Sequence, residues 1–452
     1  MRQRFCLRNI HHEAFRLVFI ALLATLLGLS ACSVESGSDD PGPAPVSESL
    51  LPEDVAEQID VLFGTDTTST TIAEPEEVVT EADPGEPTVP GVTDEYVLFG
   101  QSAAFSGPAE ELGINMRYGI QAAFAEANQG GGVFGRQLRL VSLDDSYEPE
   151  AAITNSQQLI DEEGVFALIG AVGTPTSRSA TPVAKEAGVP YIAPFTGAGF
   201  LRDAQQLENV VNLRASYNQE TEEMVKRLIE DLDITEIAVL FQDDSFGRAG
   251  YSGVLAALER RGMEPAAVGS YTRNTTAVKT AMLDIQVNEP EAVIIIGAYK
   301  PAAAMISWSR FTNFNPVFIN ISFVGSNALK EELRAYGIGV YVTQVVPFPT
   351  DDSIPVVADY LAALDAHVPE AVPGFVSLEG YLAGRLAVAI LERCGPDVNR
   401  ECFTEGLRED GDFDLGGFRL RYGENDNQGS DSVFWTVLRA DGQYHPIDRL
   451  GQ

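Results

Sequence analysis

The sequence predicts an α/β fold with parallel β-sheets divided between two lobes. From Tyr96 onward, short apolar runs alternate with segments whose apolar residues recur every three to four positions. Regular alternation of strand and helix is typical of parallel sheets flanked by helices. Hydrophobic residues make up 45% of the chain, which is enough to build substantial cores. The stretch from Tyr96 to Gln452 is too long for one sheet of ordinary size, so two lobes are expected.

The first 32 residues are typical of an export signal. Four arginines precede an apolar run at residues 17–31, which is short for a membrane span. The run ends in "LSAC", which is similar to the bacterial lipobox, where the cysteine is acylated and becomes the mature N-terminus. Residues 1–32 are therefore predicted to be a lipoprotein signal peptide with Cys32 as the lipidation site, and an ordinary cleaved signal with a chance cysteine is the alternative. We expect a membrane-anchored protein outside the cytoplasm, in the periplasm or on the cell surface.

Residues 33–95 are expected to form a disordered tether. This segment holds seventeen acidic residues and eight prolines but no lysine or arginine, a composition that cannot bury enough apolar surface to fold. The segment either holds the folded body away from a membrane or is a spacer with no particular length requirement. The sequence leaves both interpretations open.

The four cysteines have different predicted fates. Cys6 is removed with the signal peptide and Cys32 carries lipid, so Cys394 and Cys402 remain. Their spacing of eight residues and the oxidising compartment favour a local disulfide. Two unpaired thiols are the alternative.

The expected elements follow one another in a regular order. Strands are predicted at residues 95–100, 137–145, 165–172, 189–195, 237–242, 292–299 and 317–323. Helices are predicted at residues 115–128, 150–164, 179–188, 220–232 and 247–262.

Two neighbouring strand ends form a candidate anion site. Open parallel sheets bind ligands beyond the carboxyl ends of their strands. The predicted strand at 165–172 runs directly into "GTPTSR", and the strand at 189–195 runs into "FTGAG". The hydroxyls of Thr174, Thr176 and Thr196, with backbone N–H groups and helix N-termini, can hold an anionic group without a counter-cation. Helix capping by the same hydroxyls is the alternative.

Several functional classes are not supported. The "GGGVFG" segment matches a dinucleotide fingerprint in form, but it follows a helix and precedes a strand, which favours a helix-ending turn. The sequence contains no P-loop, nucleophile-elbow or HExxH motif, and only His367 and His445 lie beyond the signal peptide. No cofactor, metal or enzymatic activity is expected. With 30 basic and 66 acidic residues, the net charge of −36 disfavours a nucleic-acid partner.

Longer segments resemble one family. The segments at 106–149 and 166–198 resemble the branched-chain amino-acid (Leu/Ile/Val-binding-like) class of ABC-transporter substrate-binding proteins. The likeness continues through "NLRASYNQETEE", "DDSFGRAG", "IIIGAYKP", "FVGSNAL" and "SLEGYLAGRLAVAIL" and covers Tyr96 to Gln452. It implies a type I periplasmic binding fold, with two Rossmann-like lobes joined by three hinge crossings, expected near residues 212–217, 345–349 and 417–422. Lobe 1 is expected at 96–213 and 347–418, and lobe 2 at 214–346 and 419–452.

The resemblance also implies a set of ligand-binding residues. In the family, a hydroxyl and backbone amides of the first lobe hold the ligand carboxylate, and aromatic residues of the second lobe close over it. The family's acidic partner for the ligand ammonium aligns with Ser322, which carries no charge. Either Glu379 or another acid replaces it, or the ligand lacks an α-ammonium. The implied ligand-binding residues are Leu112, Thr174, Phe195, Thr196, Gly197, Phe246, Tyr299, Ser322, Glu379 and Tyr381.

The resemblance therefore implies a binding protein rather than an enzyme. Its expected role is to close around a small carboxylate, with a branched-chain amino acid as the leading ligand, and to present it to an ABC permease in the membrane. A sensory or regulatory lipoprotein with the same fold is one alternative. A receptor for a non-amino organic acid or an amide is the other.

Overall fold

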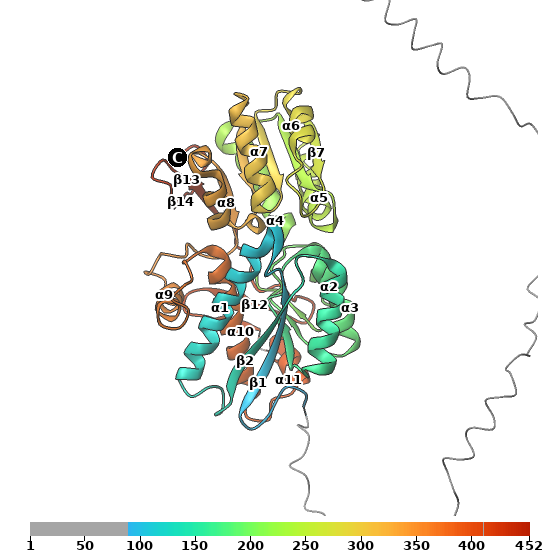
Figure 1. Ribbon diagram of the computed structural model, residues 1–452, viewed down its shortest axis with the longest axis vertical. Helices are drawn as coiled ribbons and strands as arrows, with labels where there is room; N and C mark the ends of the chain where they lie inside the picture. Colours follow the sequence, from blue (N-terminus) through green and yellow to red (C-terminus); the bar gives the residue numbers. More distant parts are fainter. Residues whose placement is uncertain (1–88, 410) are drawn as a thin grey trace, which may run out of the picture. The chain divides into compact units, whose positions relative to one another are not determined.

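The computed structural model describes residues 89–409 and 411–452 (Figure 1). The predicted signal peptide, Cys32 and residues 33–88 of the predicted tether lie outside the described residues. Residues 89–95, which were expected to be disordered, pack against the first lobe. The Leu98 N–H donates to the Gly91 carbonyl at 2.8 Å, and a Cβ at Gly91 would lie 2.1 Å from the Phe166 nitrogen. The prediction failed here because Val89 and Val92 end the acidic segment with apolar side chains that join the core.

Lobe 1 contains a five-stranded parallel sheet in the order β2-β1-β3-β4-β5. Its strands are β1 (Tyr96–Ala103), β2 (Gln137–Asp144), β3 (Ala167–Ile169), β4 (Tyr191–Ile192) and β5 (Val210–Val211). Helices α2 (Pro149–Gln157) and α3 (Thr174–Glu186) pack together on one side of the sheet (Figure 1). On the other side lie α1 (Glu110–Gln129), α9 (Pro355–His367) and α10 (Phe375–Cys394). Short helical turns complete this part of the chain at η2 (Gly107–Ala109), η3 (Gln158–Glu162) and η4 (Gly199–Arg202).

Lobe 2 contains a seven-stranded sheet in the order β14-β13-β10-β9-β8-β6-β7. The strands β6 (Ile237–Gln242), β7 (Ala267–Tyr271), β8 (Ala292–Ile296), β9 (Val317–Asn320) and β10 (Tyr341–Gln344) are parallel. The strands β13 (Phe434–Leu438) and β14 (Tyr444–Pro446) add to the β10 edge in antiparallel orientation. The helices are α4 (Tyr217–Leu232), α5 (Ser245–Glu259), α6 (Lys279–Gln286), α7 (Tyr299–Phe311) and α8 (Ser326–Leu333), with turns η5 (Ser322–Val324) and η6 (Arg334–Gly337). The structure thus has the α/β fold with parallel sheets in two lobes that the sequence predicts.

The chain passes between the two sheets three times. It leaves lobe 1 after β5 and enters α4, and it returns after β10 to reach α9. The third passage follows the hairpin of β11 (Asp412–Asp414) and β12 (Arg419–Arg421) and ends at β13. The Asn212 N–H donates to the Asn427 carbonyl at 2.8 Å, and the Gly429 N–H donates to the Asn212 carbonyl at 2.8 Å. The first and third passages therefore run side by side.

The third crossing lies later in the chain than the predicted 417–422. Gly416 and Gly417 have φ values of 90° and 95° and turn the β11–β12 hairpin, a conformation that favours glycine. The hairpin belongs to lobe 1, because the Val356 N–H of α9 donates to the Gly416 carbonyl at 2.9 Å. The boundary expected at 418/419 therefore falls inside a lobe 1 hairpin.

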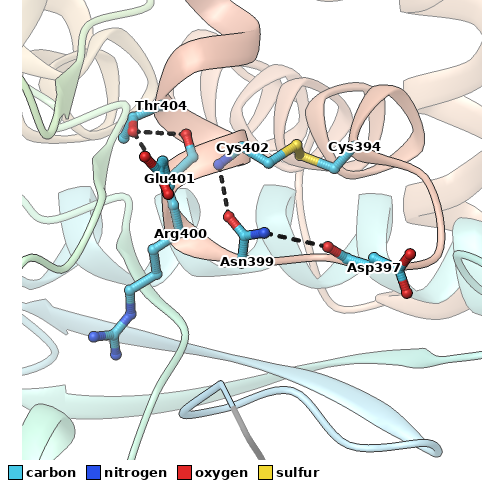
Figure 2. The surroundings of a disulfide bond; sticks show 7 residues. All are labelled: Cys394, Asp397, Asn399, Arg400, Glu401, Cys402 and Thr404. Atoms are coloured by element: carbon cyan, nitrogen blue, oxygen red, sulfur yellow. Dashed lines mark hydrogen bonds between the residues drawn. A yellow bond between two sulfur atoms is a disulfide. The ribbon is translucent and has the colours of Figure 1, made fainter.

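A disulfide fixes the last helix of lobe 1 (Figure 2). Cys394 ends α10 and bonds to Cys402 in α11 (Arg400–Glu409), with the two Cα atoms 5.7 Å apart. The Asn399 side chain accepts a hydrogen bond from the Cys402 N–H at 2.8 Å. The Arg400 guanidinium donates to the Phe166 carbonyl at 2.9 Å. The expected pairing of the two cysteines is present, and it holds α11 beside β3.

Glycines allow α10 to approach α1 closely. A Cβ at Gly119 would lie 1.9 Å from the Ser377 carbonyl oxygen, and a Cβ at Gly380 would lie 2.2 Å from the Met116 carbonyl oxygen. No side chain larger than hydrogen fits at either position without moving a backbone. This contact sets the position of Glu379, which is next to Gly380 on α10.

Candidate functional site

The first part of the site lies at the carboxyl ends of β3 and β4. Thr174 begins α3, Thr196 lies in the loop after β4, and their hydroxyl oxygens are 2.7 Å apart. Both side chains are buried, and the Thr196 hydroxyl also accepts a hydrogen bond from the Ala198 N–H at 3.2 Å. The Thr176 hydroxyl instead donates to the Val172 and Gly173 carbonyls. Thr176 therefore has a structural role, and Thr174 and Thr196 form the hydroxyl pair at this edge.

Gly197 brings the Thr196 loop against the first crossing. Its carbonyl accepts a hydrogen bond from the Tyr217 N–H at 2.7 Å. A Cβ at this position would lie 2.5 Å from the Tyr217 Cδ1 atom. The loop and the crossing are therefore in direct contact.

An aromatic cluster fills the space between the lobes. Phe323 of η5 lies 4.4 Å from Phe246 of α5, 5.5 Å from Phe195 of lobe 1 and 6.0 Å from Tyr147 of lobe 1, measured between ring centroids. Tyr217 lies 5.5 Å from Phe246. All five side chains are buried. Rings at these separations attract one another beyond the area they bury, so the cluster favours the closed arrangement of the two lobes.

A buried arginine connects the cluster to three polar side chains. Arg214 lies in the first crossing, and its guanidinium carbon lies 4.7 Å from the centroid of the Phe195 ring. Its Nη2 atom donates to the Ser322 hydroxyl and lies 3.7 Å from a Glu220 carboxylate oxygen. Its Nη1 atom lies 3.7 Å from a Glu379 carboxylate oxygen. Arg214 thus joins lobe 2, through Ser322 and Glu220, to α10 of lobe 1.

Ser322, the uncharged residue at the position where an acid was expected, is held by a neighbouring acid. Glu220 accepts hydrogen bonds from the Ser322 N–H at 3.0 Å, from the Ser322 hydroxyl at 2.9 Å and from the Thr343 hydroxyl at 2.6 Å. Glu220 is on α4, which begins with a capping box formed by Ser216 and Gln219. The carboxylate near Ser322 is therefore supplied by α4 and is occupied by three donors.

Burial changes the protonation behaviour of this charged cluster. Burial raises the pKa of Glu379 to about 7, Arg214 opposes that rise, and Glu220 adds to it. Burial also lowers the pKa of Arg202 to about 9, and the nearby Arg214 lowers it further. Arg202 donates to the carbonyls of Thr196, Ala198 and Arg214. It therefore remains a cation that fastens the Thr196 loop to the first crossing.

Leu112 and Tyr299, two further predicted ligand-binding residues, lie at another contact between the lobes. Leu112 of α1 faces Gly325, where a Cβ would lie 2.4 Å from the leucine Cδ2 atom. Tyr299 begins α7 and is buried, and its hydroxyl has no hydrogen-bond partner among the described residues. Both therefore lie where lobe 2 approaches α1 of lobe 1, because Lys300 of α7 is 3.5 Å from Glu110 of α1.

Tyr381 is not part of this group. Its hydroxyl donates to Glu126 at 2.5 Å and accepts a hydrogen bond from Arg385 at 2.8 Å. Glu126 is near the carboxyl end of α1, four turns from Leu112. Tyr381 is two positions beyond Glu379 on α10 and so points from a different face of the helix. The Tyr381 hydroxyl is therefore engaged by Glu126 and Arg385 rather than by the polar groups around Arg214.

Sequence reasoning missed several members of the site. Arg214 and Tyr217 lie inside the crossing predicted at 212–217, but the interpretation of that segment as a hinge gave no reason to assign a side-chain role. Phe323 directly follows Ser322 in a run that reads as a buried strand. Tyr147 reaches the cluster because Gly173, with φ of 104°, leaves space for its ring; a Cβ there would lie 2.2 Å from the tyrosine Cε2 atom. Across residues 89–409 and 411–452, no group of three or more His, Cys, Asp or Glu side chains is placed to hold a metal ion.

Two α/β lobes joined by three crossings, with polar groups and rings enclosed between them, define a protein that binds a small molecule by closing around it. Residues 97–443 match the family described as periplasmic binding protein, and the chain belongs to this family. The chain is similar to the Leu/Ile/Val-binding protein BraC3 of Rhizobium johnstonii, with 21% identity over 344 residues, which are 74% of this chain and 90% of that protein.

Solved structures agree with this assignment. A possible leucine/isoleucine/valine-binding protein from Rhodopirellula baltica SH 1 has a TM-score of 0.76 and 39% identity, over 79% of this chain and 98% of that chain. A substrate-binding periplasmic protein from Ralstonia solanacearum has a TM-score of 0.74 and 26% identity, over 78% of this chain and 100% of that chain. The resemblance inferred from the sequence is confirmed. The protein is an extracytoplasmic solute-binding protein with the type I periplasmic binding fold. Within the described residues, no helix is long and apolar enough to cross a membrane.

Proposed function

We propose that this protein captures a small carboxylate between its two lobes and presents it to an ABC permease while Cys32 anchors it to a membrane through lipid. The observation that carries this proposal is the buried hydroxyl pair of Thr174 and Thr196, at 2.7 Å, beside the aromatic cluster. The first turn of α3 adds backbone N–H groups that have no partner within the helix. Hydroxyls and helix N-termini both favour a negatively charged oxygen.

The neighbouring rings suit an apolar body attached to that carboxylate. The ring centroids of Phe195 and Phe246 lie 5.5 Å and 4.4 Å from that of Phe323. Each of these side chains would bury apolar ligand surface, which contributes roughly 25 cal/mol per Å². A ligand can enter when the lobes separate at the three crossings, because hinge closure is the usual motion of two lobes that are joined in this way.

Two classes of ligand match these contacts. A branched-chain or related amino acid requires an acceptor for its ammonium group, and Glu379 is a buried acid on α10 of lobe 1. A non-amino organic acid requires no such acceptor. The two classes therefore differ in what they demand of Glu379 and Arg214.

A thermal-shift panel tests the proposal. The panel contains leucine, phenylalanine, their deaminated analogues 4-methylpentanoate and 3-phenylpropanoate, and the non-carboxylates glucose and spermidine. A ligand at one hundred times its Kd stabilises the native state by about 2.7 kcal/mol, which a melting curve detects. We expect at least one carboxylate to raise the melting temperature and the non-carboxylates to leave it unchanged. A shift only with glucose or spermidine would contradict the proposal.

A further inference from the structure

Arg214 is a fully buried cation with unused hydrogen-bonding capacity. Its relative exposure is 0%, and its Nε and Nη1 atoms have no hydrogen-bond partner among the described residues. The carboxylate of Glu379 is 3.7 Å from Nη1, beyond hydrogen-bond distance. Leaving N–H groups of a buried guanidinium without acceptors costs free energy. The arrangement is therefore one that an additional acceptor would stabilise.

The open donors of Arg214 lie beside the proposed ligand site. The guanidinium carbon is 4.7 Å from the ring of Phe195, which directly precedes Thr196. The hydroxyl of Tyr217, in the same crossing, is also buried and has no hydrogen-bond partner among the described residues. Tyr217 contacts Gly197 at the end of the Thr196 loop. Donors from the hinge therefore lie next to the loop that carries the Thr196 hydroxyl.

The charges around Arg214 determine which ligand fits. Arg202, Arg214, Glu220 and Glu379 are the charged groups that act on this place, and they sum to zero when all four are ionised. Glu220 already accepts three hydrogen bonds, so it is not open to a ligand ammonium. Glu379 forms an ion pair with Arg214, so a ligand ammonium would have to share this carboxylate with the arginine.

We propose that Arg214 holds the ligand carboxylate from the hinge, and that the ligand is an apolar monocarboxylate without an ammonium group. This inference rests on the proposed function, because it specifies the solute class of the same site. The unpartnered Nε and Nη1 atoms of the guanidinium supply charge-assisted N–H donors for the carboxylate oxygens. The Thr174 and Thr196 hydroxyls and Tyr217 then complete the shell around those oxygens.

Binding of this class of ligand has a proton balance that can be measured. The ligand adds one negative charge to a buried cluster of side chains whose net charge is zero. Glu379 then takes one proton from solvent and becomes neutral. Burial already raises the pKa of Glu379 to about 7, so little additional shift is needed near neutral pH. A zwitterion adds no net charge and would bind without this proton.

Calorimetry on the wild-type chain tests the preference for a ligand without an ammonium group and the uptake of a proton on binding. We would titrate 3-phenylpropanoate and phenylalanine at pH 8 in two buffers that differ in ionisation enthalpy. We expect 3-phenylpropanoate to bind at least about tenfold more tightly, because the ammonium of phenylalanine would compete with Arg214 for the Glu379 carboxylate. We also expect a net uptake of protons on binding at pH 8, and a smaller uptake at pH 6. Tighter binding of phenylalanine, or binding of 3-phenylpropanoate without proton uptake at pH 8, would overturn the inference.

Substitutions at Arg214 test how much its side chain contributes to ligand affinity. Arg214→Met should weaken 3-phenylpropanoate by roughly a hundredfold, because a charged hydrogen-bonding partner is lost. The double variant Arg214→Met/Glu379→Gln avoids an unpaired acid and should show the same loss. Both should weaken the neutral amide 3-phenylpropanamide much less, because its carbonyl oxygen forms a weaker hydrogen bond with an arginine than a carboxylate does. The matched control is Arg385→Met, which removes an arginine paired with Glu126 elsewhere on lobe 1 and should bind 3-phenylpropanoate as the wild type does. Unchanged affinity in the double variant would overturn the role of Arg214.

The outcomes separate this inference from the proposed function. Binding of phenylalanine with no binding of 3-phenylpropanoate would refute the inference and leave the carboxylate receptor intact. Binding of neither compound, with glucose or spermidine bound instead, would refute both. The wild-type titrations give this answer even if Arg214→Met fails to fold.

Discussion

Replacement of Thr174 by valine removes one hydroxyl from the proposed site at almost constant side-chain volume. The Thr174 hydroxyl lies 2.7 Å from that of Thr196. In the complex we expect it to donate to the ligand carboxylate. Loss of a hydrogen bond to a charged group costs about 1.5–3 kcal/mol, so Thr174→Val should weaken binding by about ten- to a hundredfold. The loss in unfolding free energy should be smaller, near 1 kcal/mol, because Thr196 keeps its bond from the Ala198 N–H.

The matched control for Thr174→Val is Thr181→Val on the same helix. Thr181 is also buried, and its hydroxyl donates to the Ser177 carbonyl at 2.7 Å. It lies seven residues further along α3, about 10 Å from Thr174 at 1.5 Å per residue. Both variants should lose similar stability in urea denaturation, whereas only Thr174→Val should lose affinity in calorimetry with the carboxylate that the wild type binds most tightly. Equal affinity of Thr174→Val and wild type, or an equal loss in Thr181→Val, would refute the placement of the carboxylate.

Three further predictions concern the rest of the chain. Burial raises the pKa of Asp145 to about 7, so the native state retains a proton that the unfolded chain loses near pH 4. The unfolding free energy should therefore fall as the pH rises from 4 to 7. Urea titrations at several pH values should show a shallower fall for Asp145→Asn. Replacing Cys394 and Cys402 with serine should lower the unfolding free energy by about 2–3 kcal/mol, and stoichiometric thiol labelling of the unreduced, denatured wild type would contradict the bond. Cys32→Ser should release the protein from membranes on fractionation, and retention of the variant would contradict lipidation.

The fold could be predicted because its periodicity is local and repeated. Alternating apolar runs and amphipathic segments indicate parallel sheets, and chain length indicates two lobes. The third crossing could not be placed in this way, because two glycines in a hairpin turn and a flexible hinge look alike in sequence. Val89 and Val92 show the same limit, since a short apolar pair at the end of an acidic segment gives no periodic signal.

The site was predictable only in part, for a related reason. Thr174 and Thr196 directly follow apolar strands, so the topology alone brings them to one edge. Arg214 lies in a connection between lobes, and nothing in its local pattern shows that a cation is buried there with Glu220 and Glu379, residues distant in the sequence. Tyr381 lies two positions from Glu379 on α10, and its hydroxyl bonds to Glu126 instead, a partner that is also distant in the sequence.

Native mass spectrometry of the full chain, purified without denaturation, tests the central claim most directly. The account predicts one small molecule bound per chain, released on denaturation and identified as an apolar carboxylic acid. The same molecule should be present at lower occupancy in Thr174→Val and at wild-type occupancy in Thr181→Val. Recovery of a bound sugar, polyamine or other molecule without a carboxylate would contradict the account.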